Sequence, residues 1–272
     1  MTNTPDELKQ IVKEKYTIIA EQPMDVNASS CCGATSVCCG DGMTYSIMAD
    51  DYSGKDGYVA DADLALGCGI PTDHAGIRPG MTVLDLGSGA GNDVFIAAKE
   101  TGPDGLVIGV DMTEAMIEKA NINKTKLGAE NVDFRLGEIE SMPVDDDSVD
   151  VIISNCVLNL VPEKANAFAE MYRVLKPGGS FTVSDIVVEG DMPEHLRSVA
   201  TMYAGCVSGA VKREEYLGLI NDAGFIDVAV PKEKPIVIPD DVIQSELASF
   251  PEEQRSMGGA RLVSVTVRAF KP

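Results

Sequence analysis

The sequence has few basic residues and no cluster of them. It contains 22 lysines and arginines against 43 aspartates and glutamates, which gives a formal net charge of −21. A surface of this charge repels phosphate-rich partners. We therefore expect neither nucleic acid nor an anionic membrane surface as a partner.

Long apolar runs are also missing. No stretch of about 18 apolar residues occurs, and the polar N-terminus leads into a predicted helix without the apolar core of a signal peptide. These absences predict a soluble, cytoplasmic protein. Its 272 residues suffice for one large α/β core with additions.

Conventional metal-site patterns are scarce as well. The two histidines, His74 and His195, belong to no ligand motif. The seven cysteines are odd in number, which argues against a disulfide scaffold. Four of them form pairs at 31–32 and 38–39, without the Cys-x₂₋₄-Cys spacing of zinc knuckles. Four cysteines in nine positions favour soft-ion capture or thiol exchange, with a disordered segment of incidental cysteines as the alternative.

The clearest positive signal is a glycine loop between a strand and a helix. Residues 81–92 read MTVLDLGSGAGN, in which an apolar strand runs into Gly87, Gly89 and Gly91. Glycines let the backbone approach a ligand, and the helix N-terminus offers unpaired N–H groups. A second apolar strand ends at Asp111, 22 positions beyond Gly89, where a nucleotide-binding βαβ unit places an acid for ribose hydroxyls.

The loop has Gly-x-Gly-x-Gly spacing, with Asp85 before it and Leu-Lys-Pro-Gly-Gly at 175–179 leading into a later strand. Together these features resemble the S-adenosylmethionine (SAM) site of class I methyltransferases. The resemblance implies an α/β fold with a Rossmann-like, mostly parallel sheet, helices on both faces and an antiparallel closing strand. The strands at 226–230 and 263–268 fit that closing pair, and 235–260 would be a C-terminal insertion.

Local patterns predict several further elements. A capping box at Thr4 starts a helix over 4–22, and 51–66 is expected to be a short helix or turn. The fifth strand is expected at 181–188 and a helix at 193–202, while the three aspartates at 145–147 are typical of a solvated acidic turn.

Three cysteines stand in separate motifs. Cys68 lies in Leu-Gly-Cys-Gly, Cys156 in Ser-Asn-Cys-Val after the fourth strand, and Cys206 in Gly-Cys-Val-Ser-Gly-Ala. The glycines around Cys68 predict a loop tip rather than a buried apolar filler. Cys156 stands where many amino-group methyltransferases carry Asp/Asn-Pro-Pro-aromatic. Together with Asp-Met-Thr at 111–113 and Ser-Asp-Ile at 184–186, these motifs resemble those of arsenite methyltransferases.

That resemblance implies methyl transfer from SAM to trivalent arsenic, supplied as arsenite or its thiol conjugate. Cys68, Cys156 and Cys206 would hold As(III) as three thiolates, which suits a soft three-coordinate centre, and its lone pair would attack the methyl. A thiol reductant, thioredoxin or glutathione, would restore As(III) through a fourth cysteine, for which Cys32 is the first choice. The other candidates for that fourth cysteine are Cys31, Cys38 and Cys39.

The same resemblance assigns cofactor contacts. Asp85 and the loop glycines would hold the methionine part and the ribose edge, and Asp111 would bind the ribose hydroxyls. Glu138, or Glu140 in its place, would flank the adenine in the turn after the third strand. Asn155 would lie beside the carboxypropyl or methyl end. The remaining expected cofactor residues are Gly87, Gly89, Gly91, Met112 and Ile139.

On this reading the chain has three regions. Residues 1–66 form an N-terminal helix and Cys-rich extension, 67–190 the SAM-binding core, and 191–272 the arsenic-site and sheet-closing region. Two alternatives remain open. One is a class I methyltransferase acting on a small organic acceptor, such as a quinone precursor or a sterol. The other is a non-catalytic, thiol-based arsenic-binding protein.

Overall fold

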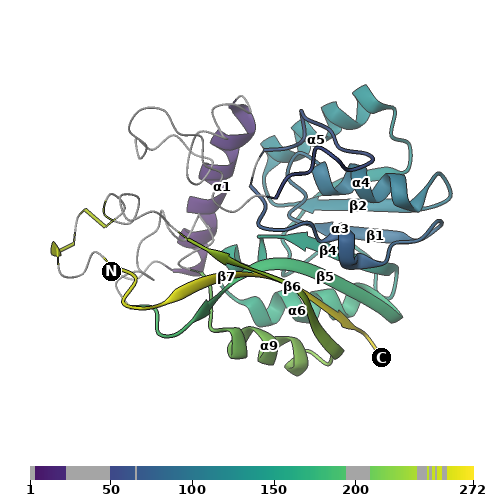
Figure 1. Ribbon diagram of the computed structural model, residues 1–272. Coiled ribbons are helices and arrows are strands. Elements are labelled where there is room, and N and C mark those ends of the chain that lie inside the picture. The colour runs from purple at the N-terminus through teal and green to yellow at the C-terminus, as the bar shows by residue number, and fades with distance from the viewer. Residues whose placement is uncertain are drawn as a thin grey trace.

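A mixed sheet runs through the described part of the chain. The computed structural model describes residues 4–22, 50–64, 66–193, 209–237, 244, 247–248, 250–252 and 256–272. The strands are β1 (Thr82–Leu86), β2 (Leu106–Asp111), β3 (Val132–Leu136), β4 (Val149–Asn155), β5 (Leu175–Glu189), β6 (Ile226–Ile236) and β7 (Arg261–Phe270). Within these residues the seven strands are ordered β3-β2-β1-β4-β5-β7-β6. Figure 1 labels all of them except β3. The first five pair in parallel, whereas β7 is antiparallel to both β5 and β6. The predicted class I methyltransferase sheet is confirmed.

Helices cover both faces of the sheet. They are α1 (Pro5–Glu21), α3 (Thr72–Ala75), α4 (Asn92–Thr101), α5 (Glu114–Leu127), the 3₁₀ turn η1 (Leu158–Leu160), α6 (Lys164–Val174) and α9 (Arg213–Asp222). In Figure 1, α4 and α5 lie on one side of the sheet and α6 and α9 on the other, with α1 beside the carboxyl ends of the strands. No helix of the described residues is long and apolar enough to cross a membrane.

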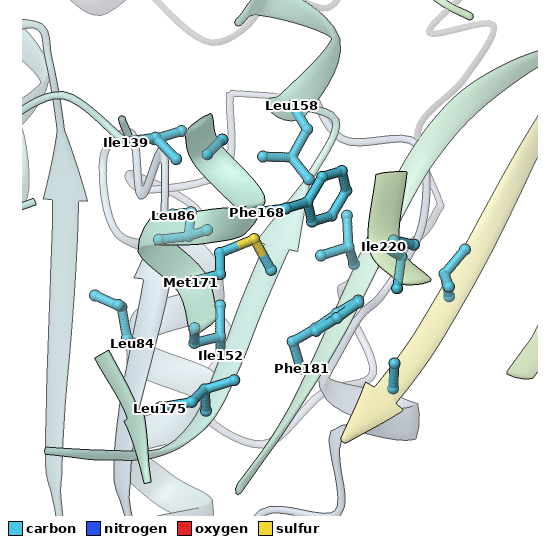
Figure 2. Packing of buried hydrophobic residues seen from close by; sticks show 14 of the residues in the cluster. Leu84, Leu86, Ile139, Ile152, Leu158, Phe168, Met171, Leu175, Phe181 and Ile220 are labelled. Carbon is cyan, nitrogen blue, oxygen red and sulfur yellow. The ribbon is translucent and has the colours of Figure 1, made fainter. Parts of the chain in front are cut away.

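Two apolar layers follow from the alternation of side chains along each strand. Leu84 and Leu86 of β1 point toward α6 and pack with Phe168 and Met171, as Figure 2 shows. Val83, one position away, belongs instead to the layer under α4 and α5. A strand that is apolar on both faces is thus buried on both, as the run at 81–86 predicts.

Helix α1 begins at the predicted capping box. Thr4 accepts a hydrogen bond from the Glu7 N–H at 3.3 Å, and Glu7 accepts one from the Thr4 N–H at 2.7 Å. Its buried residues Val12, Ile19 and Ala20 then face the domain.

Three strands are longer than predicted, and β7 extends over Arg261–Phe270 rather than 263–268. β5 begins at Leu175 rather than at 181, because the Lys-Pro-Gly-Gly stretch already extends along the sheet. β6 continues to Ile236 rather than ending at 230, so the start predicted for the insertion at 235 is wrong. β6 is the edge strand, which tolerates Pro231 and Pro235 because one row of its backbone groups needs no ladder partner.

The segment 51–66, of which residue 65 is not described, contains turns. The one-turn helix α3 was not predicted, and its C-cap, Gly76, has the left-handed conformation. Of the predicted helix at 193–202, only residue 193 belongs to the described part of the chain. Much of the expected insertion at 235–260 lies outside that part as well.

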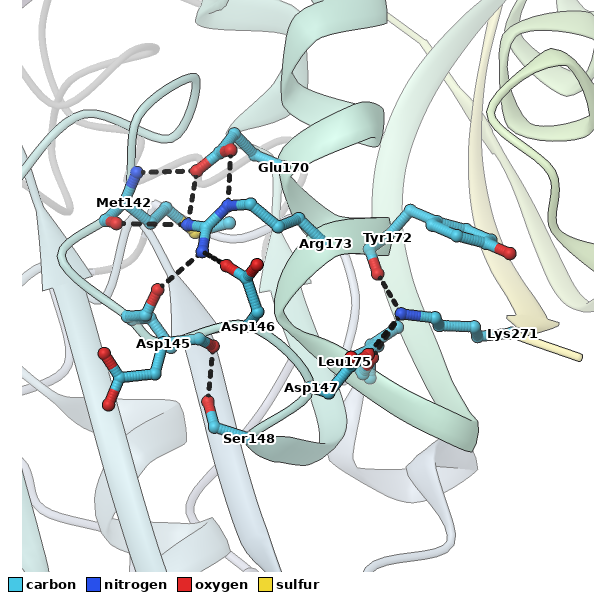
Figure 3. A network of polar contacts seen from close by, with 11 residues as sticks. Met142, Asp145, Asp146, Asp147, Ser148, Glu170, Tyr172, Arg173, Leu175 and Lys271 are labelled. Carbon is cyan, nitrogen blue, oxygen red and sulfur yellow. Dashed lines mark hydrogen bonds and ion pairs between the residues drawn. The ribbon is translucent and has the colours of Figure 1, made fainter.

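A polar network fixes the loop between β3 and β4 to α6. Arg173 donates to Glu170 and Asp146, and Glu170 accepts the Met142 N–H at 3.0 Å, as Figure 3 shows. Lys271 contacts Asp147 at 2.6 Å from the other side. Two of the three aspartates of the acidic turn are therefore ion-paired, and they anchor the loop just before the start of β4.

Candidate functional site

A pocket lies at the carboxyl ends of β1, β2 and β4. It leaves about 1090 Å³ free of protein atoms, part of it open to solvent. The glycine loop forms its floor, and Lys9, Val12 and Tyr16 of α1 form part of its lining. Ligands of open parallel sheets bind at this edge, so the pocket is where the strand topology places a binding site.

The three loop glycines serve different purposes. All have positive φ, 64° at Gly87, 51° at Gly89 and 99° at Gly91. A Cβ at Gly87 would lie 2.6 Å from Val157, and one at Gly91 would lie 2.8 Å from Phe95. At Gly89, chain neighbours aside, the nearest heavy atom of the described residues would be the Met116 sulfur at 4.0 Å, so its backbone faces open pocket. Gly87 and Gly89 line the pocket, whereas Gly91 is required by packing.

Three carboxylates are gathered in the pocket. Burial raises the pKa of Asp85 well above its usual range, and repulsion from Asp93 and Asp111 raises it further. Burial also raises the pKa of Asp93, to about 6, against hydrogen bonds from Asn155 and Tyr52 that lower it. This excess of buried negative charge favours a ligand that brings a positive group.

Asp111 is oriented by the glycine loop. One carboxylate oxygen accepts the Gly89 N–H at 3.0 Å, and the other accepts the Thr113 N–H at 2.8 Å. Burial raises the pKa of Asp111, whereas these backbone donors lower it. Nearby, the Ser88 hydroxyl and the Asn92 side-chain oxygen are buried in the pocket wall with no hydrogen-bond partner among the described residues. Unsatisfied buried polar atoms of this kind indicate that the pocket is built for a polar ligand.

Of the two described cysteines, Cys156 lines the pocket and Cys68 does not. Cys156 follows β4 with a left-handed φ of 62°, unusual for a residue with a side chain, and its N–H donates to the Ser184 carbonyl at 2.7 Å. Cys68 is 1% exposed, and both cysteines belong to one buried apolar cluster. The prediction that Cys68 stands at a loop tip is therefore wrong: its flanking glycines allow close packing instead.

A hydrogen-bond network ties the Cys68 loop to the end of β4. The Asn155 side-chain oxygen accepts the Cys68 N–H at 3.0 Å, and its amide nitrogen lies 2.8 Å from the Gly69 carbonyl. The same nitrogen lies 2.7 Å from the Tyr52 hydroxyl. The Asp93 carboxylate accepts from that hydroxyl at 3.0 Å.

The other expected cofactor residues divide into two groups. Met112, Ile139 and Asn155 line the pocket with Asp85 and Asp111. Glu138 does not line it, since its carboxylate pairs with Lys9 at 2.7 Å and with Lys13 at 3.5 Å. Glu140 does line it and also contacts Lys9, at 3.0 Å.

Sequence reasoning missed Asp93 and the contribution of α1. Asp93 is the second residue of α4, and an acid in the first helical turn after a glycine loop was a usable signal. The placement of Lys9, Val12 and Tyr16 over the pocket had no local signal, because it depends on how α1 packs.

The remaining predicted thiols, Cys206 and Cys32, lie outside the described residues. Ala210, the last residue of the Cys206 motif, is described and belongs to the same buried cluster as Cys68 and Cys156. Within the described residues, no three histidine, cysteine, aspartate or glutamate side chains gather as a metal site requires.

Comparisons with known proteins agree with this geometry. A family model described as a methyltransferase domain matches residues 77–224. The arsenite methyltransferase of Halobacterium salinarum is 44% identical over 98% of this chain and 68% of its own length. That of Aquipseudomonas alcaligenes is 33% identical over 97% of this chain and 72% of its own.

Among solved structures, an arsenic(III) S-adenosylmethionine methyltransferase from Chlamydomonas reinhardtii is 39% identical, with a TM-score of 0.65 over 75% of this chain and 67% of that one. The YcgJ protein from Bacillus subtilis, 22% identical, superposes with a TM-score of 0.56 over 73% of this chain and 95% of its own. This second likeness concerns the fold alone.

Proposed function

The chain belongs to the arsenite methyltransferase family, and from that premise we propose that it methylates trivalent arsenic with SAM as the methyl donor. The observation that carries the proposal is the pairing of two features in one pocket. Its acids and glycine loop suit SAM, and two buried cysteines, Cys68 and Cys156, adjoin it.

The polar groups of the pocket fit SAM. Asp85 offers a buried carboxylate to the ammonium of the methionine part, and a positive partner would offset the burial and the repulsion that raise its pKa. The Asp111 carboxylate, oriented by the Gly89 and Thr113 N–H groups, lines the pocket and would accept a hydrogen bond from a ribose hydroxyl. Met112 and Ile139 supply apolar surface for the adenine, and Ser88 supplies an unsatisfied hydroxyl.

The thiols would form the arsenic site. Arsenite, As(OH)₃, exchanges three hydroxides for three thiolates, and each thiol proton leaves with a hydroxide as water. Cys68 and Cys156 would supply two thiolates and Cys206 the third. Because four residues span at most about 14 Å, Cys206 can reach the cluster that contains Ala210. Three-coordinate sulfur suits a soft centre and leaves its lone pair outward.

When bound, SAM supplies a methyl group on a cationic sulfur, which the lone pair of thiolate-bound As(III) can attack. No protein base is needed for that attack, so the chain would act by orientation. Val12 and Leu160 pack in the cysteine cluster and would keep water from the thiolates. Methylation formally oxidises arsenic to As(V), so a thiol reductant, thioredoxin or glutathione, would return two electrons through an N-terminal cysteine such as Cys32.

Under this scheme each of the three regions of the chain would have its own role. Residues 1–66 would cover the site and carry the thiol relay, 67–190 would bind SAM, and 191–272 would complete the arsenic site and the sheet.

The test incubates the purified protein with arsenite, labelled-methyl SAM and a thiol reductant, and resolves the arsenic species by mass. Cys156→Ser is measured beside it, with SAM affinity determined for both proteins by titration calorimetry. We expect methylated arsenic from the parent chain. In the variant the yield should fall at least about 100-fold at unchanged SAM affinity, because serine is a poor ligand for a soft centre.

Two results would contradict the proposal. No methylated arsenic from a parent chain that binds SAM but does not bind arsenite would indicate an organic acceptor. Tight arsenite binding without turnover in the presence of SAM would indicate sequestration.

A further inference from the structure

The hydrogen bonds of Asn155 converge on one loop. Its side-chain oxygen accepts the Cys68 N–H at 3.0 Å, and its nitrogen contacts the Gly69 carbonyl at 2.8 Å. One amide side chain thus contacts the backbone on both sides of the Cys68 side chain. On the far side, Ser264 of β7 donates to the Cys68 carbonyl at 2.6 Å.

The loop packs too closely for any residue but glycine beside Cys68. A Cβ at Gly67 would lie 2.5 Å from the Asn155 nitrogen, and one at Gly69 would lie 2.5 Å from the Ser184 hydroxyl. Contacts this short would force the loop or its partners to move. The glycines therefore let the loop lie directly on the ends of β4 and β5.

Asn155 is itself oriented by two buried groups. Tyr52, which is 5% exposed, accepts from the Asn155 nitrogen at 2.7 Å, and its hydroxyl reaches the Asp93 carboxylate at 3.0 Å. Asp93 also accepts from that nitrogen at 3.3 Å. A buried amide with these partners has one favourable orientation, because turning it over would bring its oxygen against the carboxylate.

Asn155 immediately precedes Cys156, so its contact with Cys68 joins the two cysteine segments. We propose that Asn155, held by Tyr52 and Asp93, is a positioning residue that fixes the Cys68 loop so that Cys68 and Cys156 bind one arsenic together. The inference deepens the proposed function and rests on it. Asn155 still borders the pocket, but its amide atoms are used by the loop.

The test isolates the two thiols in the full-length chain. The probe is phenylarsine oxide, which takes two thiols: two As–S bonds form, and the oxide oxygen leaves with both thiol protons as water. Cys68 and Cys156 are the only cysteines retained. The cysteines changed to serine are Cys31, Cys32, Cys38, Cys39 and Cys206. Native mass spectrometry then measures the affinity for the doubly bonded phenylarsenic, and calorimetry measures the affinity for SAM.

Tyr52→Phe removes one hydroxyl and keeps the ring. We expect it to weaken phenylarsenic capture about 10-fold, as the loss of a buried hydrogen bond predicts. Asn155→Ala removes both loop contacts and should weaken capture about 100-fold. Because both residues also border the SAM pocket, SAM affinity should fall too, but by clearly less than phenylarsenic capture in each variant, a difference that general destabilisation would not produce. The control is Tyr58→Phe, at a half-buried tyrosine of the same segment whose hydroxyl bonds Asp63.

Three outcomes would overturn the inference. First, the parent chain could fail to capture phenylarsenic through two As–S bonds. Second, the Tyr52 and Asn155 variants could capture it as tightly as the parent. Third, SAM affinity could fall as much as capture does. Thermal unfolding confirms that each variant is folded. Capture requires no methyl transfer, so a chain that captures phenylarsenic through this network but makes no methylated arsenic overturns the proposed function alone.

Discussion

The two ends of the pocket are built in different ways. At the cofactor end, Gly89 and Asp111 are 22 positions apart in sequence and belong to one βαβ unit. At the thiol end, Cys68 is held by Asn155, 87 positions away, and by Ser264, 196 positions away. A site made of one local unit can be recognised from spacing, whereas a site joined across the sheet requires the fold.

The ends also differ in the carboxylates that they bury. At the cofactor end, Asp85 and Asp93 line the pocket, where a ligand can neutralise them. Near the thiol end, Asp185 is fully buried in β5 and accepts from the Tyr216 hydroxyl at 3.2 Å. Burial raises the pKa of Asp185 to about 7. Four substitutions test whether the two ends are separable.

Asp85→Asn should have the largest effect, and on the cofactor end alone. We expect SAM affinity to fall at least about 100-fold, since the variant removes the buried charge that faces the ammonium. Because the raised pKa of Asp85 makes its charged form unfavourable in the folded protein, the ligand-free variant should unfold at a higher temperature at pH 8. Calorimetry and thermal melts measure both. Unchanged SAM affinity, or an equal loss of phenylarsenic capture, would show that the ends are not separable.

Gly67→Ala should act mainly on the thiol end. Its new Cβ would meet the Asn155 amide, so we expect phenylarsenic capture to fall about 10-fold with a smaller loss of SAM affinity. Gly218→Ala is the matched control, because nothing lies within 4 Å of a Cβ there. In α9 that control should add about 0.5–1 kcal/mol of stability. A larger effect on SAM than on capture would contradict this assignment.

Asp185→Asn should change how stability depends on pH. The Asp185 carboxyl has a pKa of about 7 in the folded protein, against an ordinary value of 3.8, so it binds a proton more tightly in the folded state. Its contribution to the free energy of unfolding therefore falls as the pH rises from 3.8 to 7. From pH 5 to pH 8 the parent should lose about 2 kcal/mol more unfolding free energy than the variant. Urea melts at the two pH values measure this. The difference should persist with saturating SAM, since Asp185 does not line the pocket.

Lys9→Gln should have the smallest effect. It removes the ion pairs that join α1 to Glu138 and Glu140, and such partly exposed pairs contribute about 1 kcal/mol or less. SAM affinity should fall about threefold at low salt, and the gap to the parent should close as salt screens the pairs. Lys13→Gln, whose pair with Glu138 is longer, should do less. A gap that is independent of salt would indicate a packing role for the Lys9 stem.

The sequence predicted much of the fold, because its signals were local. The apolar run before Gly87 gave a strand buried on both faces, and the capping box at Thr4 gave the start of α1. The start of β5 and the end of β6 were missed, because stretches that contain proline or polar residues extend along a sheet only when a neighbouring strand is present. Glu138 and Glu140 could not be told apart, because the choice depends on where Lys9 of α1 lies.

The sequence by itself determined the residue types on which the proposed function depends: a glycine loop with Asp85 and Asp111, which predicts a nucleoside site, and cysteines in motifs that resemble those of arsenite methyltransferases. These properties depend on residue type and short spacing. Only the tertiary structure decided that Cys68 is buried, that Asn155 joins its loop to Cys156, and that α1 lies over the pocket. Each of these depends on contacts between segments far apart in the chain, which form only when the sheet brings those segments together.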